Sequence, residues 1–131
     1  MDPTNLLRAG LKFLADQQIQ YASDPITYAR GYDSIDLRAI FDRERLKVAD
    51  AEGFVRIEYT DMSFRMRPGD LVLGGEQVTP ERGDLIHVPD GYDVYTFQVT
   101  PFEGEPAWSY LDPHHHFLIV RTKRVNIERW S

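Results

Sequence analysis

The histidine triplet His114-His115-His116 has the clearest potential for metal chemistry in this sequence. Imidazole is the commonest side-chain ligand for transition metals, and alternate residues of a strand, here His114 and His116, point to the same face. Two histidines do not complete a site, and no carboxylates at metal-ligand spacing accompany them. Because histidines are common in solvated loops, we predict no metal and no cofactor.

The remaining histidine, His87, lies in segment 83–91, which combines a Gly-Asp start with a Pro-Asp-Gly turn. This segment resembles the second conserved stretch of the cupin barrels, in which a Gly-led strand turns through Pro-x-Gly toward a metal-binding histidine. That position is Val94 here, and the upstream His-x-His and Glu are missing because His87 is the first histidine of the chain. The resemblance covers one β-turn-β hairpin, and a cupin-like barrel that binds a small molecule or metal remains an alternative.

Carboxylates are the other groups that could do acid–base chemistry. The candidates are five aspartates of the predicted β region, most of which stand beside Gly or Pro, where Asp normally caps turns. These residues are Asp61, Asp70, Asp84, Asp90 and Asp93. The sequence has no nucleophile elbow, phosphate loop or dinucleotide fingerprint, and it has no cysteine for thiol chemistry. We therefore predict no catalytic residue and no enzyme.

Composition favours one soluble domain. A chain of 131 residues with 42% hydrophobic residues can bury a single core. The start of the chain lacks the features of a signal peptide, and no apolar run approaches the ~18 residues of a membrane span. The formal charge of −6 repels polyanions, which disfavours tight DNA binding but suits a wall past which DNA slides.

The first 22 residues have the pattern of an amphipathic helix. Asp2 or Thr4 can cap it, and apolar residues then recur at helical spacing up to Tyr21. Ser23-Asp24-Pro25 ends it, because proline biases the preceding residue toward extended backbone.

From Ile26 onward, short strands alternate with turn residues. We predict a hairpin of strands 26–30 and 34–41, and a long bent strand over 54–66 after a polar connection at 50–53. Two similar turn-and-strand units at 68–73 and 82–88 follow. The second leads through Pro89-Asp90-Gly91 into a strand from Tyr92 to Val99.

In that strand the candidate inward residues are Val94, Thr96 or Phe97, and Val99. An aromatic loop runs from Pro101 to His114, and a closing strand runs from Phe117 to Val125. In the closing strand the basic residues Arg121 and Lys123 are predicted to face solvent.

The predicted fold is mainly β, with an N-terminal α-helix followed by a small antiparallel β-barrel or sandwich of about six strands. The whole chain, 1–131, is predicted to be a single domain, with the helix at 1–22, the barrel at 25–125 and a C-terminal tail at 126–131.

The helix, the stretch from Pro25 to Val125 and two motifs together resemble a known family. The motifs are Leu71-Val72-Leu73-Gly74-Gly75 and the segment 80–86, followed by Asp90-Gly91-Tyr92 and an aromatic strand. This pattern resembles the head-tail connector, or head-closure (stopper), proteins of the tailed-bacteriophage neck. The resemblance implies a virion protein, assembled in the host cytoplasm, that forms a homo-oligomeric ring between portal or adaptor above and tail terminator or tail tube below. It implies that DNA passes the ring without specific binding, and it involves no membrane.

A tail-completion or adaptor subunit of the same neck is the alternative within this family. Candidate channel or neighbour contacts are placed on three loops, Phe41 to Gly53, Gly74 to Glu81 and Phe102 to His116. The charged first loop could gate the channel or be an ordinary exposed connection. Trp108 and Tyr110 are the predicted docking residues. The full candidate set is Asp42, Arg43, Glu44, Arg45, Lys47, Glu76, Gln77, Phe102, Trp108, Tyr110 and Asp112.

Overall fold

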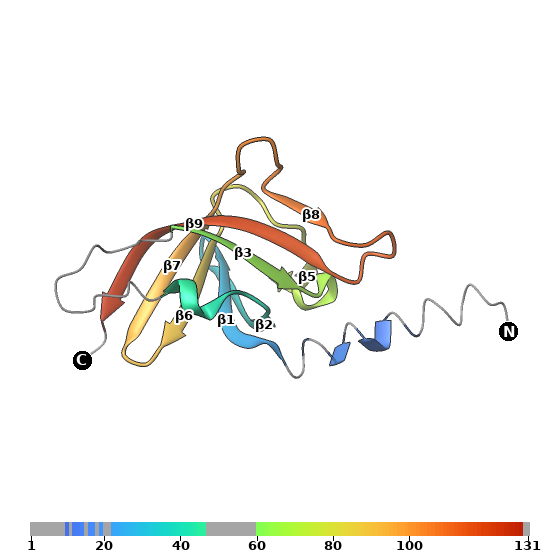
Figure 1. The fold of residues 1–131 in the computed structure, drawn as a ribbon, viewed down its shortest axis with the longest axis horizontal. Coiled ribbons are helices and arrows are strands. Elements are labelled where there is room, and N and C mark those ends of the chain that lie inside the picture. The colour runs from blue at the N-terminus through green and yellow to red at the C-terminus, as the bar shows by residue number, and fades with distance from the viewer. Residues whose placement is uncertain are drawn as a thin grey trace, which may run out of the picture.

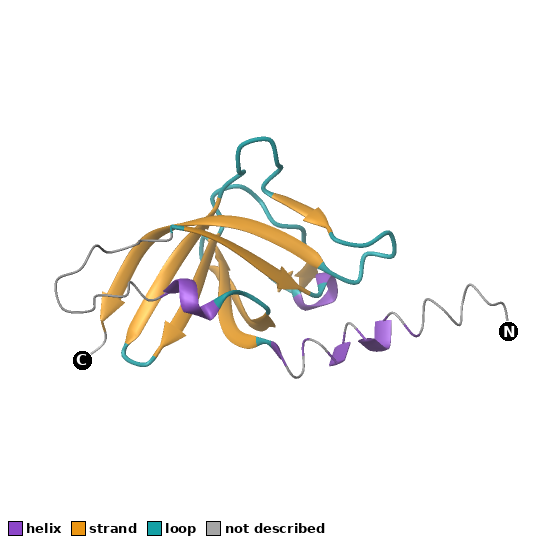
Figure 2. Cartoon of the chain, in the orientation of Figure 1, coloured by secondary structure: helices purple, strands orange, loops and turns teal. Residues whose placement is uncertain are grey.

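The structure, a computed structural model, describes residues 10, 12–14, 16–17, 19, 22–46 and 60–129, and these residues are mainly β (Figure 2). The strands are β1 (Asp24–Arg30), β2 (Asp33–Ala39), β3 (Asp61–Met66), β4 (Val72–Leu73), β5 (Glu76–Gln77), β6 (Leu85–Asp90), β7 (Asp93–Val99), β8 (Trp108–Tyr110) and β9 (Leu118–Arg129). Two 3-10 turns, η1 (Arg43–Leu46) and η2 (Pro68–Asp70), complete the elements.

The main sheet is antiparallel and curled into a half-barrel (Figure 1). Its strand order is β2-β1-β6-β7-β9-β3, with β8 paired to β9 beside β7, while β4 and β5 form a separate two-stranded ribbon. Ile40, just after β2, forms a bridge with Arg65 of β3 through two backbone hydrogen bonds of 2.8 and 2.9 Å. The curl therefore brings the two edges of the sheet together at one point, and the predicted mainly β fold is confirmed.

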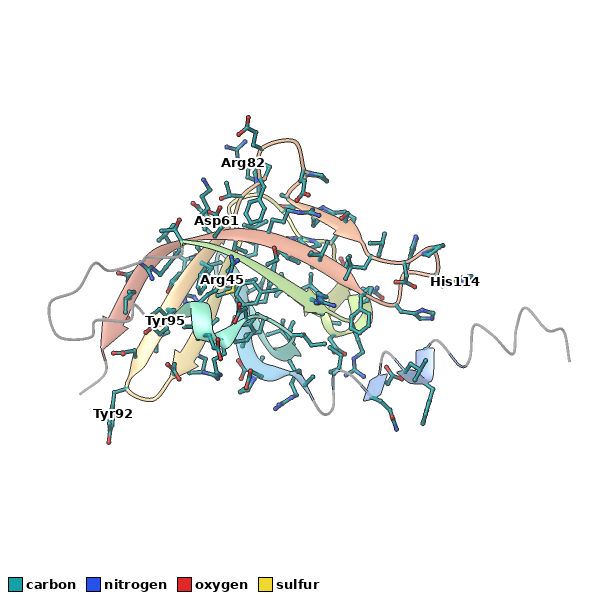
Figure 3. The ribbon with its side chains drawn as sticks, in the orientation of Figure 1. Arg45, Asp61, Arg82, Tyr92, Tyr95 and His114 are labelled. Carbon is teal, nitrogen blue, oxygen red and sulfur yellow. The ribbon has the colours of Figure 1, made fainter. Side chains whose placement is uncertain are left out.

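Both predicted hairpins are confirmed, and both depend on the same turn chemistry. Gly31 joins β1 to β2 with φ of 59°, and Gly91 joins β6 to β7 with φ of 61°. Glycine reaches positive φ at no steric cost, and a two-residue turn with glycine first matches the twist of antiparallel strands. The tyrosine that follows each glycine is exposed, and Figure 3 shows Tyr92 pointing away from the tip of its hairpin.

The core lies on the concave side of the curled sheet. Its largest fully buried side chains include Tyr28, Phe64 and Phe97, and the Phe64 and Phe97 rings meet edge to face at 5.4 Å. Along β7 the inward residues are Tyr95, Phe97 and Val99. The prediction of Val94 as an inward residue was wrong, because the strand starts at Asp93 with the opposite phase.

The closing strand is longer than predicted, because β9 runs to Arg129 and includes most of the expected tail. Pairing with β7 shifts between Thr96 and Phe97, where Val125 is the extra residue of a bulge. Before the bulge the inward residues of β9 are Leu118, Val120 and Thr122, whereas after it Ile127 lies opposite the inward residue Tyr95. The bulge therefore changes the inward phase, and Val125 at the bulge is 53% exposed.

The predicted helix is described only in part. Residues 12–14 are helical, as are Gly10, Asp16, Gln17, Ile19 and Ala22, and the other residues of 1–21 lie outside the described part of the chain. Ile19 is buried, and Arg67 binds Asp16 at 3.1 Å, which ties these helical pieces to the β region. No helix within the described residues is long and apolar enough to cross a membrane.

Of the predicted strand 54–66, residues 61–66 are confirmed as β3. Residues 47–59, which include the polar connection at 50–53, lie outside the described residues.

Candidate functional site

The first predicted contact loop, Phe41 to Gly53, is described up to Leu46 and is anchored there. Leu46 is fully buried, and the Phe41 ring packs against Phe64 with 5.1 Å between centroids. Asp42 accepts a hydrogen bond from the backbone N–H of Glu44 at 3.2 Å, and its carboxylate lies 3.5 Å from the guanidinium of Arg45. These local contacts hold η1 as a tight turn, and Lys47 lies outside the described residues.

Arg43 attaches this turn to one end of the sheet. Its Nη1 donates to Asp90 at 3.0 Å, and its Nε lies 3.5 Å from Asp24. Asp24 begins β1 and Asp90 ends β6, which run antiparallel, so both carboxylates lie at the same end. The guanidinium also lies 5.8 Å from the centre of the Phe41 ring. The guanidinium of Arg43 therefore contacts three residues of its own chain, Asp24, Asp90 and Phe41.

The second loop, Gly74 to Glu81, contains the β4–β5 ribbon. Gly74 and Gly75 both have positive φ, 61° and 84°, which is the backbone of a tight hairpin turn. Leu73 packs in the core on one side of this turn, whereas Glu76 and Gln77 are exposed on the other. Both predicted contact residues are thus presented on a short hairpin.

The far end of the second loop is fixed by a buried carboxylate that sequence reasoning had treated as a turn cap. Asp84 is 4% exposed and accepts hydrogen bonds from the Tyr28 hydroxyl, from Arg30 Nε at 2.9 Å and from Arg30 Nη2 at 2.8 Å. The backbone N–H of Glu81 also donates to it at 2.8 Å, and Arg30 donates to the carbonyl of Thr79 at 2.7 Å.

These partners determine how the cluster ionises. Burial alone would raise the pKa of Asp84, but the hydrogen bonds from Arg30 and Tyr28 outweigh it and hold this pKa below its ordinary value. Burial, reinforced by the Asp84 carboxylate, raises the pKa of the Tyr28 hydroxyl.

The cluster joins β1 to the loop before β6. The alternation of Ile26, Tyr28 and Arg30 on one face of β1 was the available signal that Tyr28 and Arg30 share a side.

The third loop, Phe102 to His116, contains a strand that was not predicted. Trp108 to Tyr110 form β8 along β9, and their rings meet edge to face at 5.4 Å while packing partly against the core. Each of the two predicted docking residues is therefore partly packed against the core and partly exposed. Phe102 forms a bridge with Glu105 at the start of the loop.

Asp112 organises the far end of this loop. Its Oδ1 accepts hydrogen bonds from the backbone N–H groups of His116 at 2.8 Å and Phe117 at 3.1 Å. Burial opposes ionisation, but these N–H groups outweigh it and hold the pKa of Asp112 below its ordinary value. His115 takes a positive φ of 59° and stacks on Tyr110 with 3.6 Å between ring centroids.

Arg121 was predicted to face solvent, and this was wrong. The loop before β8 covers it, with Glu105 at 2.7 Å from its Nε and the carbonyl of Pro106 accepting from its Nη1 at 2.8 Å. Arg121 is 9% exposed, whereas Lys123 is exposed as predicted.

Two of the three loops meet at one cavity of about 480 Å³. Gln77 comes from the second loop and Tyr110 from the third, and helical residue Asp16 and Arg67 line the same space. Asp42, Arg43, Glu44 and Arg45 do not line it. Of the predicted residues, Gln77 and Tyr110 therefore lie at this cavity, and Asp42 to Arg45 form a separate region at η1.

The structure offers little to a metal ion. Among the described residues, no group of three or more His, Asp or Glu side chains is placed to hold one. His87 lies on the outer face of β6 and shares a hydrogen bond of 2.9 Å with Thr96, so it does not point into the barrel as a cupin-like pocket would need.

Sequence comparison identifies the chain. Residues 4–129 match the family described as phage head-tail joining protein. The chain belongs to this family. Comparisons with curated proteins and with solved structures give no match. Membership supports a structural role in the phage neck, within the virion and in contact with other neck, head or tail proteins, and the family is one of structural proteins rather than enzymes.

Proposed function

We propose that this head-tail joining protein forms a ring of identical subunits in the neck, between portal or adaptor and tail, where it closes the filled head and lets DNA pass. The observation that carries the proposal is the family match over residues 4–129, which includes the whole half-barrel. Closed rings of identical subunits need two different contact surfaces on each copy, and a chain with several exposed loops can provide them.

The charge of the chain supports passage of DNA rather than binding. With a formal charge of −6, a ring of identical copies would repel the phosphate backbone at long range and give DNA little to adhere to. We further propose that the two regions of loop residues contact neighbouring proteins or border the channel. Glu76 and Gln77 are both exposed on the β4–β5 ribbon, and Asp42, Glu44 and Arg45 are exposed at η1.

A reconstruction of the neck of intact particles by electron cryo-microscopy tests the position and the ring. The expected result is ring-shaped density between portal and tail that fits this half-barrel in every subunit. Density that places the chain beyond the tail terminator, or particles that lack it, would overturn the proposal. A ring attached directly to the portal would instead support the adaptor alternative.

Substitutions test the loop residues in particles. Replacing Glu76 and Gln77 with alanine is expected to reduce the yield of joined heads and tails without changing the unfolding temperature, because both side chains are exposed. Arg82→Ala is the matched control, since Arg82 is exposed on a different turn (Figure 3). Equal yields from both variants would argue against a contact at the β4–β5 ribbon.

A further inference from the structure

The outer face of the three central strands, β1, β6 and β7, carries no ionisable acid, lysine or arginine. Their inward residues form the core, so the alternate positions face outward. This outer face consists of Pro25, Thr27, Ala29, Leu85, His87, Pro89, Val94, Thr96 and Gln98. We call it the central outer face.

The outer faces of β2 and β3, at the two edges of the main sheet, are charged by contrast. In a chain with 27% charged residues, the outer face of β2 carries Asp36 and Arg38, and that of β3 carries Asp61 and Arg65. The charged residues of β1 and β6 stand at the strand ends and are used in the contacts of Arg43 and Asp84. Charge is depleted at the centre of protein interfaces, so this distribution is typical of a contact surface.

Three of the four polar side chains of the central outer face, Thr27, His87 and Thr96, have hydrogen-bond partners on the same sheet. The Thr27 hydroxyl donates to Asp36 at 2.7 Å, and His87 Nδ1 lies 2.9 Å from the Thr96 hydroxyl. Cross-strand register places Thr27 beside His87 and His87 beside Thr96, in one row. Covering this row would therefore leave few unsatisfied hydrogen-bonding groups, which removes the main cost of burying polar atoms.

The charges around the face indicate what covers it. Two copies of a chain with a charge of −6 repel each other, and a face without ionised groups is where they can approach at least cost. Each margin carries one cation and one anion. On the β2 side these are Arg38 beside Pro25 and Asp36 beside Thr27, and on the β9 side they are Lys123 beside Gln98 and Glu128 beside Val94. A second copy turned about the strand direction brings Arg38 of each copy to Glu128 of the other.

We propose that the central outer face binds the same face of a second copy, with β6 of the two copies at the centre. This pairing goes beyond the proposed function, since it requires no portal, tail or DNA. Three strands spaced about 4.8 Å apart cover less area than a standard stable interface, so the pair forms at high protein concentration. Pairing would place Leu85 of one copy near Leu85 of the other.

The absence of cysteine makes a cross-linking test specific. Leu85→Cys in the full chain, treated with a short bismaleimide at high concentration, is expected to give a product of twice the 15.2 kDa chain mass. Ser63→Cys, on the outer face of β3, is the matched control and is expected to remain a monomer. Equal cross-linking of the two variants, or none with Leu85→Cys, would overturn the pairing.

A charge placed on the face sharpens the test. Adding Ala29→Asp to Leu85→Cys is expected to abolish the product, because Ala29 lies beside Leu85 and each copy would then bury an unpaired carboxylate against Gln98 of the other. Adding Ser63→Asp instead is expected to leave it unchanged. If Ala29→Asp prevents folding, Gln98→Glu replaces it, since Gln98 is exposed beside Leu85 on the other side. The neck reconstruction is independent, so pairing and neck position can fail separately.

Discussion

The two ends of the β1–β6 pair are each held by an arginine and carboxylates, but in different surroundings. At one end Asp84 is 4% exposed and is bound by Arg30, Tyr28 and a backbone N–H. At the other end Arg43 is 37% exposed and lies between Asp24 and Asp90. Ion pairs in water contribute little, whereas breaking a buried one leaves an uncompensated charge. The two ends are therefore expected to differ in their contribution to stability because of burial, more than because of residue type.

The largest effect is expected from Asp84→Asn. This change leaves the Arg30 guanidinium without its charged partner and should lower the free energy of unfolding by about 3 kcal/mol. Urea unfolding followed by circular dichroism measures it. Asp90→Asn makes the same chemical change at the exposed end and is expected to cost much less. Equal losses would show that burial does not distinguish the two ends.

Acid should weaken the Asp84 end. The pKa of Asp84 is lower in the folded chain than its ordinary value of 3.8, so the unfolded chain binds more protons in this range. The stabilisation is complete above pH 3.8 and is lost as pH falls through the folded pKa. Unfolding measured between neutral pH and pH 2 should show a smaller acid loss in Asp84→Asn than in the unchanged chain. Parallel curves would contradict this role.

Alkali should weaken the same end through Tyr28. The pKa of this hydroxyl is raised above its ordinary value of 10.0, so its contribution is complete below pH 10 and declines as pH rises further. Tyr28→Phe removes the titrating group and should flatten the fall in stability above pH 10. Tyr92→Phe, at an exposed hairpin tip, is the control that should leave the curve unchanged.

An intermediate effect is expected at Asp112. Asp112→Ala removes the acceptor for two backbone N–H groups and should cost about 1 kcal/mol, with faster hydrogen exchange at His116 and Phe117. Asp112→Asn keeps one acceptor oxygen and should retain part of the protection. Unchanged exchange in the alanine variant would show that other contacts order this loop.

The smallest effect is expected from Arg43→Ala. Because its guanidinium and Asp24 are each more than one-third exposed, the loss should be below about 1 kcal/mol and should shrink as salt is added. A double-mutant cycle with Asp90→Ala isolates the pair energy. A salt-independent loss would mean that the contact with the Phe41 ring matters more than the ion pairs.

Local turn chemistry made the hairpins predictable, because Gly31 and Gly91 allow the positive φ that a two-residue hairpin turn requires, and this needs no long-range contact. It was harder to predict which residues of a strand face the core. Val94 and Tyr95 are both apolar, and the start of β7 decides which of them faces the core. The short strand β8 was read as an aromatic loop, since three residues between Gly and Pro carry too little pattern to show pairing with β9.

Longer-range contacts explain the remaining differences. Arg121 fits a solvent-facing position by alternation alone, and only the folded loop places Glu105 over it. Asp84 follows a glycine like any turn carboxylate, and its burial depends on Tyr28 and Arg30 more than fifty residues earlier. Of the candidate site, the sequence placed Glu76 and Gln77 on a loop, and the structure exposes both on the β4–β5 ribbon. The sequence did not show that Gln77 and Tyr110 line the same cavity.

The position of β9 has a consequence for synthesis of the chain. This strand pairs with β3, β7 and β8, yet all three precede it in the sequence. While the ribosome is still translating residues before Leu118, β3 and β7 each lack a neighbour and expose unpaired backbone groups that can pair with other chains. The sheet can be completed only once β9 has emerged, so newly made copies pass through an aggregation-prone stage late in translation.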